Sequence, residues 1–248
     1  MTADPLAPLL DLADVPAWLA EARDRVDRAM RHRALRRRGG HVAAAVSVRS
    51  AAASAALEGH GYAPEELAAG TVTDPIAQGA LRVAEVLGGL ADRWPRAPWQ
   101  VLARLHVLAA RGVLRDGELG RPVRDPAVAA RLETLSALVA GGSAVDPVVR
   151  AAVVHGELLA LRPFAGPYGV VARAGGRLTL ISSGFDPRGL LAIDVGHHER
   201  EPEYRGASAA FATGTPDGLR AWLRHCATAV GRAADELATI ADEVSTAE

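Results

Sequence analysis

The segment LRPFAGPYGVVAR, residues 161–173, carries the residues whose types and spacing best suit chemistry. It leaves an apolar stretch, passes through a glycine-containing turn and enters a second stretch that begins with valines and ends on Arg173. A loop that leads into a helix is the layout of an anion site, because the first backbone N–H groups of a helix are free to bind a phosphate or carboxylate. Arg162 and Arg173 bracket the loop and could bind such an anion through paired hydrogen bonds.

Catalytic side chains are scarce in this segment and in the chain as a whole. Arg162 cannot act as a general base, because a guanidinium stays protonated in water. Pro167 has no N–H group and therefore removes one donor that would face an anion. The chain has no lysine and no asparagine, and all 28 basic residues are arginine. The lack of lysine excludes a phosphate-binding P-loop and Schiff-base chemistry.

The histidines elsewhere leave alternatives open. His155 stands in an apolar stretch before Arg162, with Glu157 close by, so it is either a substitute base or a buried core residue. The apolar surroundings favour the core. His197 and His198 lack a third ligand at a recognisable spacing, and we expect no metal site there.

Four other residues are weaker candidates. Tyr168, at the tip of the loop, could stack on a base or contact a partner, or could simply be a neutral replacement. Ser182 and Ser183 lack the Gly-x-Ser-x-Gly turn that exposes a hydrolase nucleophile. Trp222 has the apolar spacing of a core anchor in the last helix.

Charge and composition restrict the partners. The formal net charge is −1 and the isoelectric point is about 6.7, which argues against a protein that binds nucleic acid by neutralising phosphates. A local exception is the run from Arg31 to Arg38, with five arginines and one histidine. This run could bind nucleic acid or an acidic surface, but cations near a helix C-terminus complement its dipole, and we favour a solvated helix face.

Cysteine usage and hydropathy suggest a compartment. Cys226 is the single cysteine, so the chain has no intrachain disulfide and no cysteine-based zinc site. No apolar run approaches the roughly 18 residues that span a bilayer, and the N-terminal residues do not resemble a secretion signal. We therefore expect a cytoplasmic protein that binds no membrane.

Helical periodicity dominates the chain and predicts an all-α helical bundle. The residues from Gly112 to Pro126, GVLRDGELGRPVRDP, hold many turn residues and predict one short β-hairpin. The loop from Gly70 to Pro75 is the best boundary, which separates N-terminal helices at 1–72 from a helical core at 73–248. The predicted helices lie at residues 14–38, 41–59, 76–90, 99–108, 128–139, 148–161, 170–182 and 219–241.

In this context, residues 161–173 resemble the signature of the Fic (Fido) family, whose members mostly transfer AMP from ATP to a protein hydroxyl. The family pattern is His-x-Phe-x-Asp/Glu-Gly-Asn-Gly-Arg-x-x-Arg between two helices, and Phe164, Gly169 and Arg173 occupy matching positions. The preceding stretch AAVVHGELLALRPF, with His155, is similar to the family's helix before the motif. The resemblance implies that Gly112 to Pro126 is the family's flap, a hairpin that aligns a target protein by main-chain bonding.

A third segment strengthens the resemblance. SAALEG, residues 54–59, is similar to the family's inhibitory motif, which implies inhibitory roles for Ser54, Glu58 and Gly59. In the family, the glutamate of this motif pairs with the last arginine of the active-site motif and obstructs nucleotide binding. The resemblance therefore implies an ion pair between Glu58 and Arg173. The alternative is that Glu58 is a surface carboxylate at a helix end.

The departures from the signature bear on activity. Arg162 stands where the family has its catalytic histidine, and Gly166 replaces the acidic residue that holds magnesium. Pro167 and Tyr168 replace Gly-Asn, and Val170 replaces the first arginine. Loss of a general base lowers a rate about 10²- to 10⁴-fold, and loss of an anion donor about 10²- to 10³-fold. We therefore expect no catalytic residue and no metal ligand in the loop.

Two functions follow from this comparison. The first is a degenerate Fic-fold protein that lacks AMP transfer and acts as a binding or regulatory module, with a protein target at the flap. The second is an enzyme that still binds a nucleotide or phosphate ester through Arg162, Phe164, Gly169 and Arg173, and transfers a phosphate-containing group. No cofactor is certain, and ATP is the candidate for the second function. The oligomeric state does not follow from the sequence.

Overall fold

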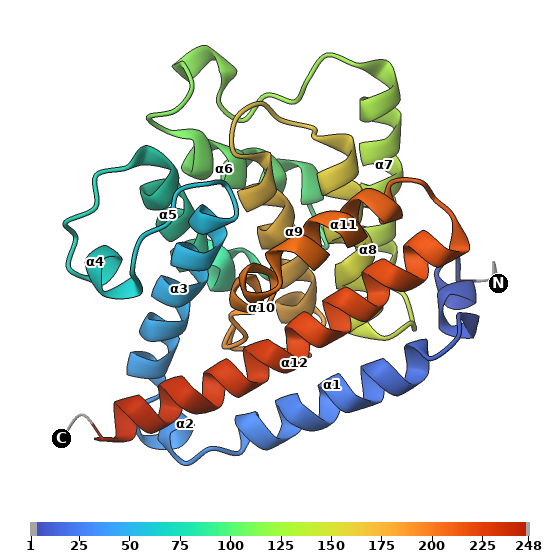
Figure 1. Ribbon diagram of the computed structural model, residues 1–248. Helices are drawn as coiled ribbons and strands as arrows, with labels where there is room; N and C mark the ends of the chain where they lie inside the picture. The colour runs from blue at the N-terminus through green and yellow to red at the C-terminus, as the bar shows by residue number, and fades with distance from the viewer. Residues whose placement is uncertain (1–3, 247–248) are drawn as a thin grey trace.

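The chain folds into a bundle of α-helices, which confirms the predicted all-α fold class (Figure 1). The computed structural model describes residues 4–246. The α-helices are α1 (Val15–Met30), α2 (Ala34–Arg37), α3 (Gly39–Ala56), α4 (Pro64–Ala68), α5 (Pro75–Leu90), α6 (Pro98–Ala110), α7 (Pro126–Gly141), α8 (Pro147–Leu161), α9 (Tyr168–Ser182), α10 (Ile193–Glu199), α11 (Glu201–Phe211) and α12 (Pro216–Thr246). None of the helices in this range is long and apolar enough to cross a membrane.

Asp-Pro pairs start three of these helices. Asp74, Asp125 and Asp146 precede α5, α7 and α8, and each is followed by a proline at the first helical position. Each aspartate side chain accepts a hydrogen bond of 2.8–2.9 Å from the N–H group two residues further on. The aspartate satisfies a free donor, and the proline has the φ angle of a helix and no N–H group to leave unpaired. These starts are therefore encoded locally.

The helix predicted at residues 14–38 is interrupted. It ends at Met30, and the short helix α2 follows after a turn. The structure also has α10 and α11, which the periodicity did not predict, between residues 193 and 211. Helix α10 has only seven residues, and the buried face of α11 consists of Tyr204, Ala207 and Phe211 alone, so the apolar stripe of each helix is weak in the sequence.

The hairpin predicted from Gly112 to Pro126 is absent, and this part of the prediction is wrong. Among the described residues, this region has one isolated bridge, between Arg111 and Leu114, and a 3-10 turn at Asp116–Glu118. Its backbone bonds to a different part of the chain, because the N–H of Val123 donates to the carbonyl of Pro163 at 2.9 Å. We keep the name flap for residues 112–126.

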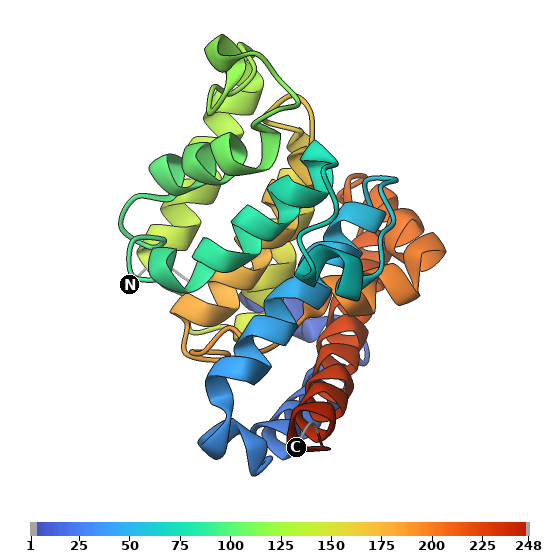
Figure 2. The ribbon, with the colours of Figure 1, turned by 90° about the vertical axis from the view of Figure 1, so that its left-hand side faces the viewer.

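Helices α8 and α9 form the centre of the bundle, with an apolar cluster on each side. One cluster joins them to α1, α10, α11 and α12, and the other joins them to α5 and α6. Figures 1 and 2 show α12 lying along α1 on one side of the molecule, and α5 and α6 on the other. Helix α3 contributes to both clusters. The domain division at residues 72/73 remains a prediction.

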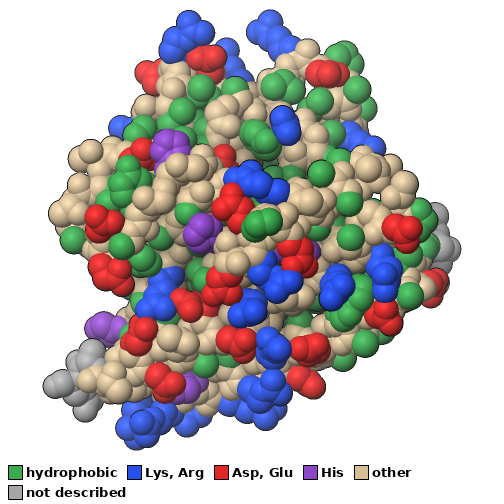
Figure 3. Space-filling view, viewed as in Figure 1, with side chains coloured by type: hydrophobic (Ala, Val, Ile, Leu, Met, Phe, Trp, Pro, Cys, Tyr) green, Lys and Arg blue, Asp and Glu red, His purple; other side chains and the backbone are tan. Residues whose placement is uncertain are grey.

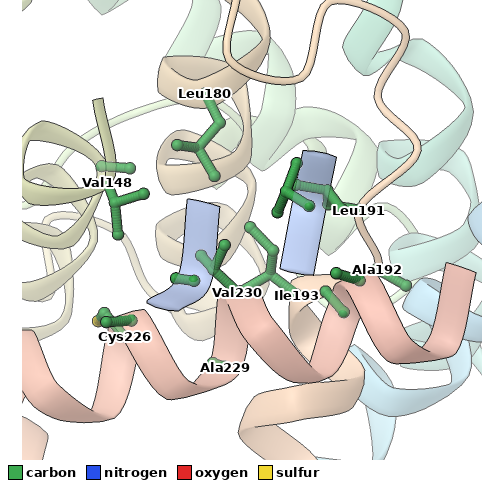
Figure 4. Packing of buried hydrophobic residues seen from close by; sticks show 14 of the residues in the cluster. Val148, Leu180, Leu191, Ala192, Ile193, Cys226, Ala229 and Val230 are labelled. Carbon is green, nitrogen blue, oxygen red and sulfur yellow. The ribbon is translucent and has the colours of Figure 1, made fainter. Parts of the chain in front are cut away.

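Figure 4 shows the apolar packing between α8, α9 and α12. Val148, Leu180 and Val230 come from these three helices and point toward one another, and Leu191 reaches the same layer from the loop before α10. Cys226 lies in this layer, and its burial raises the pKa of the thiol well above the usual value. A buried protonated thiol is a poor nucleophile, so Cys226 acts as a packing residue.

Glycine allows the closest approach of α5 to α6. A Cβ on Gly79 would lie 2.2 Å from the carbonyl oxygen of Ala109, whereas Gly88, in the same helix, has nothing within 4 Å. We expect Gly79→Ala to lower the free energy of unfolding by at least about 2 kcal/mol, because backbone must move. Gly88→Ala should raise it by about 0.5–1 kcal/mol, through helix propensity. Urea unfolding of both variants measures the difference, and equal effects would contradict this packing.

Candidate functional site

The loop between α8 and α9 begins with a strained backbone. Arg162 caps α8 in the left-handed conformation, with φ 45° and ψ 56°, and its N–H donates to the carbonyl of Leu158. A non-glycine residue with this backbone is uncommon, and it turns the chain sharply away from the helix axis. Phe164 follows and is 2% exposed, so it anchors the loop in the core. The loop is therefore a rigid structure held at its start and middle.

His106 holds the flap against this loop. Its ring stacks on Phe164 with the centroids 4.6 Å apart. The N–H of Gly120, in the flap, donates to Nδ1 of His106 at 2.9 Å, so the proton of the neutral ring is on Nε2, which donates to the carbonyl of Ala165 at 3.0 Å. Burial lowers the pKa of His106 and keeps it neutral. Nothing in the sequence pointed to this role beyond the helical spacing of His106.

A pocket opens where α9 begins. It has a volume of about 370 Å³, within the range of small-molecule sites. The guanidinium of Arg162 lies 5.4 Å from the ring centre of Tyr168, which is a cation–π contact at the N-terminus of α9. The polar side chains that line the pocket are Glu58, Arg162, Tyr168, Arg173, Tyr204, Arg205 and Ser208. Arginine side chains from three elements thus reach one pocket.

Glu58 and Arg173 form an ion pair beside this pocket. Nη2 of Arg173 lies 2.8 Å from Oε1 of Glu58, and the side chains are 3% and 19% exposed. Gly59, with φ +92°, turns the chain directly after Glu58 at the end of α3. Glu58 is therefore paired with Arg173 and is not a free surface carboxylate.

Gly169 makes room for this ion pair. A Cβ at this position would lie 2.2 Å from Oε1 of Glu58 and 3.1 Å from Nη1 of Arg173. The carboxylate of Glu58 therefore lies directly against the first turn of α9, where free N–H groups and the helix dipole favour an anion. The protein's own carboxylate lies where the sequence pattern predicted an external anion.

Arg173 has further partners on the side away from the pocket. Its Nε donates to Oγ of Ser54 at 2.9 Å, and Nη2 donates to the carbonyl of Ser54 at 2.8 Å. Oδ1 of Asp194, in α10, lies 3.4 Å from Nε. Burial works against the charge of Arg173, but the Tyr204, Glu58 and Asp194 oxygens outweigh it and raise the pKa of the guanidinium. Arg173 is thus a permanent buried cation.

The network continues one turn further along both helices. Nη1 of Arg177 donates to Oγ of Ser50 at 2.7 Å and lies 3.6 Å from Oδ2 of Asp194. The hydroxyl of Ser50 donates to the same carboxylate oxygen at 2.6 Å. Asp194 therefore lies between two arginines. The spacing of four that joins Ser50 to Ser54 and Arg173 to Arg177 was the available signal, since such residues share a helix face.

A cluster of histidines packs behind Arg173. His155 is buried, and its Nε2 lies 3.0 Å from the hydroxyl of Tyr204, as expected for a core histidine. Nδ1 of His197 lies 2.9 Å from Nε2 of His225. Trp222 packs against His155 with the ring centres 5.1 Å apart. None of the three histidine rings lines the pocket.

Three sequence candidates lie away from this arrangement. His198, on α10, is half exposed and close to Glu201. Ser182 and Ser183 lie at the far end of α9, where their hydroxyls donate to carbonyls of their own helix. Within residues 4–246, no group of three or more His, Cys, Asp or Glu side chains could hold a metal ion.

The comparisons with known proteins identify the fold. No protein-family model matches the chain, and no curated protein matches it in sequence. Among solved structures, a Fic family protein from Desulfovibrio desulfuricans G20 matches with a TM-score of 0.71 and 20% identity, over 94% of this chain and 75% of that one. Residues 134–508 of Fic-1 from C. elegans match with a TM-score of 0.66 and 20% identity, over 96% and 76%. The chain therefore has the Fic fold.

Alanine at position 169 tests the contact between Glu58 and α9. We expect Gly169→Ala to lower the free energy of unfolding by about 3 kcal/mol, because its Cβ displaces the carboxylate from a largely buried ion pair. In a Glu58→Ala background, the same substitution should cost less than about 1 kcal/mol, since the clash is gone. Urea unfolding of the four proteins gives the coupling energy, and simple additivity would contradict the contact.

Acidification should destabilise the protein below about pH 6.5, the unfolded pKa of histidine. Burial lowers the pKa of His106, His155 and His197, and lowers that of His225 to about 4. The unfolded chain then binds more protons, so stability falls as pH decreases, by roughly 1.4 kcal/mol for each net proton and pH unit. Asp186, whose pKa burial raises to about 6, offsets about one histidine over the same window.

Urea unfolding between about pH 7.5 and pH 4.5 measures this dependence. The exposed residue His41 supplies the control, because His41→Gln should leave the profile unchanged. If the free energy of unfolding of the wild type does not change below pH 6.5, the buried histidines do not determine its dependence on pH.

Proposed function

We propose that this Fic-fold protein lacks AMP transfer and acts as a binding or regulatory module through its flap and loop. The observation that carries the proposal is the lining of the pocket, in which no side chain is suited to take a proton from a target hydroxyl. Arg162 stands at the position of the family's histidine and is a cation. Burial raises the pKa of Tyr204 to about 12, so its hydroxyl stays protonated. Glu58 is bonded to Arg173.

ATP with magnesium does not fit the residues present. Gly166, at the position of the family's acidic residue, offers no ligand, and a Cβ at this position would lie 3.4 Å from the side chain of Leu114 in the flap. Glu58 is the one carboxylate among the described residues that line the pocket, and it already neutralises Arg173. Its position against Gly169 also blocks the start of α9. We therefore derive no transfer step through ATP.

The flap is the proposed docking surface for a protein partner. Val113 and Val123 are 38% and 40% exposed, and two N–H groups of the flap donate to the carbonyl of Pro163 in the loop and to the ring of His106 in α6. A rigid surface with exposed apolar side chains binds a partner without first having to become ordered. A cytoplasmic location stays part of this proposal.

The alternative function is binding, and transfer, of a phosphate-containing group, and one observation favours it. Arg162, Arg173 and Arg205 all line the same pocket, and Arg162 forms no ion pair with another described residue. Arginine binds phosphate through two parallel hydrogen bonds. Arg205 is less available, because it donates to the carbonyl of Leu57 and pairs with Glu201.

Calorimetric titration of ATP, with and without magnesium, separates the two functions. We expect no binding to the wild type or to Glu58→Gln, and no transfer of label from radioactive ATP by either protein. Glu65→Gln, on the exposed surface of α4, is the matched control for the loss of one carboxylate. Transfer of label from ATP above background would refute the proposal that the protein lacks AMP transfer. Binding that appears in Glu58→Gln alone would favour the alternative function.

A further inference from the structure

Five arginines at the corner between α1 and α2 form a surface that the pocket and flap leave unexplained. We call this surface the basic tip, and it consists of Arg28, Arg31, Arg33, Arg36 and Arg37. All five side chains are exposed, and none forms an ion pair or hydrogen bond with another described residue. Arginine side chains gather along the lower edge of Figure 3, where Figure 1 places α1 and α2.

The corner itself is held firmly in the fold. His32 lies within this run, and its Nε2 is 3.1 Å from a carboxylate oxygen of Asp242 in α12. Arg38 donates from Nη1 to the carbonyl of Val244 at 2.8 Å. Ala34 and Leu35, between the exposed arginines, are buried. These anchors hold the corner to α12, so the five arginines are presented on an ordered backbone.

Helix dipoles explain only part of this concentration of charge. Arg28 lies in the last turn of α1, and Arg36 and Arg37 lie in the last turn of α2, where cations are favourable. Helix α2 has only four residues, so its dipole is small. The whole chain has a net charge of −1, yet these five arginines fall within ten consecutive residues without a counter-ion. An acidic partner would relieve their mutual repulsion.

The surroundings of the tip limit its partner to a short polyanion. Asp24 and Asp27, exposed on α1, precede Arg28 and Arg31 by four residues, and Asp242 of α12 contacts His32 within the run. These carboxylates would repel an extended polyanion, such as duplex nucleic acid or an anionic membrane, beyond the tip itself. The tip also has no aromatic side chain on which nucleotide bases could stack.

We propose that the basic tip binds a short acidic segment of a partner protein, rich in Asp and Glu. Each arginine can hold a carboxylate through two parallel hydrogen bonds. Figures 1 and 2 place this corner at the opposite end of the molecule from the flap, which lies between α6 and α7. Binding at the tip therefore leaves the pocket and the flap open, and this proposal does not depend on the proposed function.

Binding of a fluorescein-labelled peptide of alternating Glu and Gly, roughly ten residues long, tests the proposal. The tip variant carries Arg31→Glu, Arg36→Glu and Arg37→Glu. The control carries Arg93→Glu, Arg96→Glu and Arg104→Glu, which makes the same charge change at three exposed arginines elsewhere on the surface that form no ion pair with a described residue. We expect saturable binding by the wild type that weakens at least about tenfold from low to high salt. The tip variant should lose about tenfold or more in affinity, and the control less than about threefold.

Other outcomes would overturn the proposal. Equal losses in the two variants would mean that only bulk charge matters, and no saturable binding at low salt would mean that the tip is a solvated face. Tighter binding of a single-stranded DNA of equal charge, or of vesicles containing phosphatidylserine, would assign the tip to a different class of partner. Thermal melting of each variant confirms that the comparison is between folded proteins.

Discussion

Arg173 is a buried cation, and the arrangement of the site depends on neutralising it. Its side chain is 3% exposed, and a charge at that depth is tolerated only when carboxylates and hydrogen-bond acceptors surround it. Those acceptors come from three different places: Glu58 and the carbonyl of Ser54 at the end of α3, Asp194 on α10, and the hydroxyl of Tyr204 on α11. One guanidinium thus ties α3, α10 and α11 to the central helix α9.

The same network decides what the pocket can do. Because Glu58 lies against Gly169, the first turn of α9 already faces the protein's own carboxylate. Behind Arg173, burial keeps the rings of His155 and His197 neutral and the hydroxyl of Tyr204 protonated. These three groups therefore carry no charge of their own. The histidine side chains that could do proton chemistry are buried behind Arg173, while three of the seven polar side chains that line the pocket are arginine.

In the flap, the hydrogen bonds of a neutral histidine take the place of pairing between two strands. His106 accepts from the backbone of Gly120 and donates to the backbone of Ala165, so one ring joins the flap to the loop. Gly112 and Gly120 have positive φ angles, which bend the flap and prevent two extended strands from forming within it. Its main-chain groups bond across to the loop, and the turn-rich sequence is compatible with either arrangement.

The sequence by itself determined the features that depend on neighbours in the chain. The Asp-Pro helix starts, the loop at residues 161–173 and the lack of a general base at Arg162 follow from local chemistry, and the motif resemblance pointed to the pairing of Glu58 with Arg173. Only the tertiary structure decided the roles of Asp194, Tyr204, Arg205 and His106. Helical periodicity reports contacts three or four residues apart, whereas the bond from Ser50 to Asp194 joins residues 144 positions apart. A buried charge selects its partners by proximity in the folded core, and that proximity is set by how α3, α9 and α10 pack.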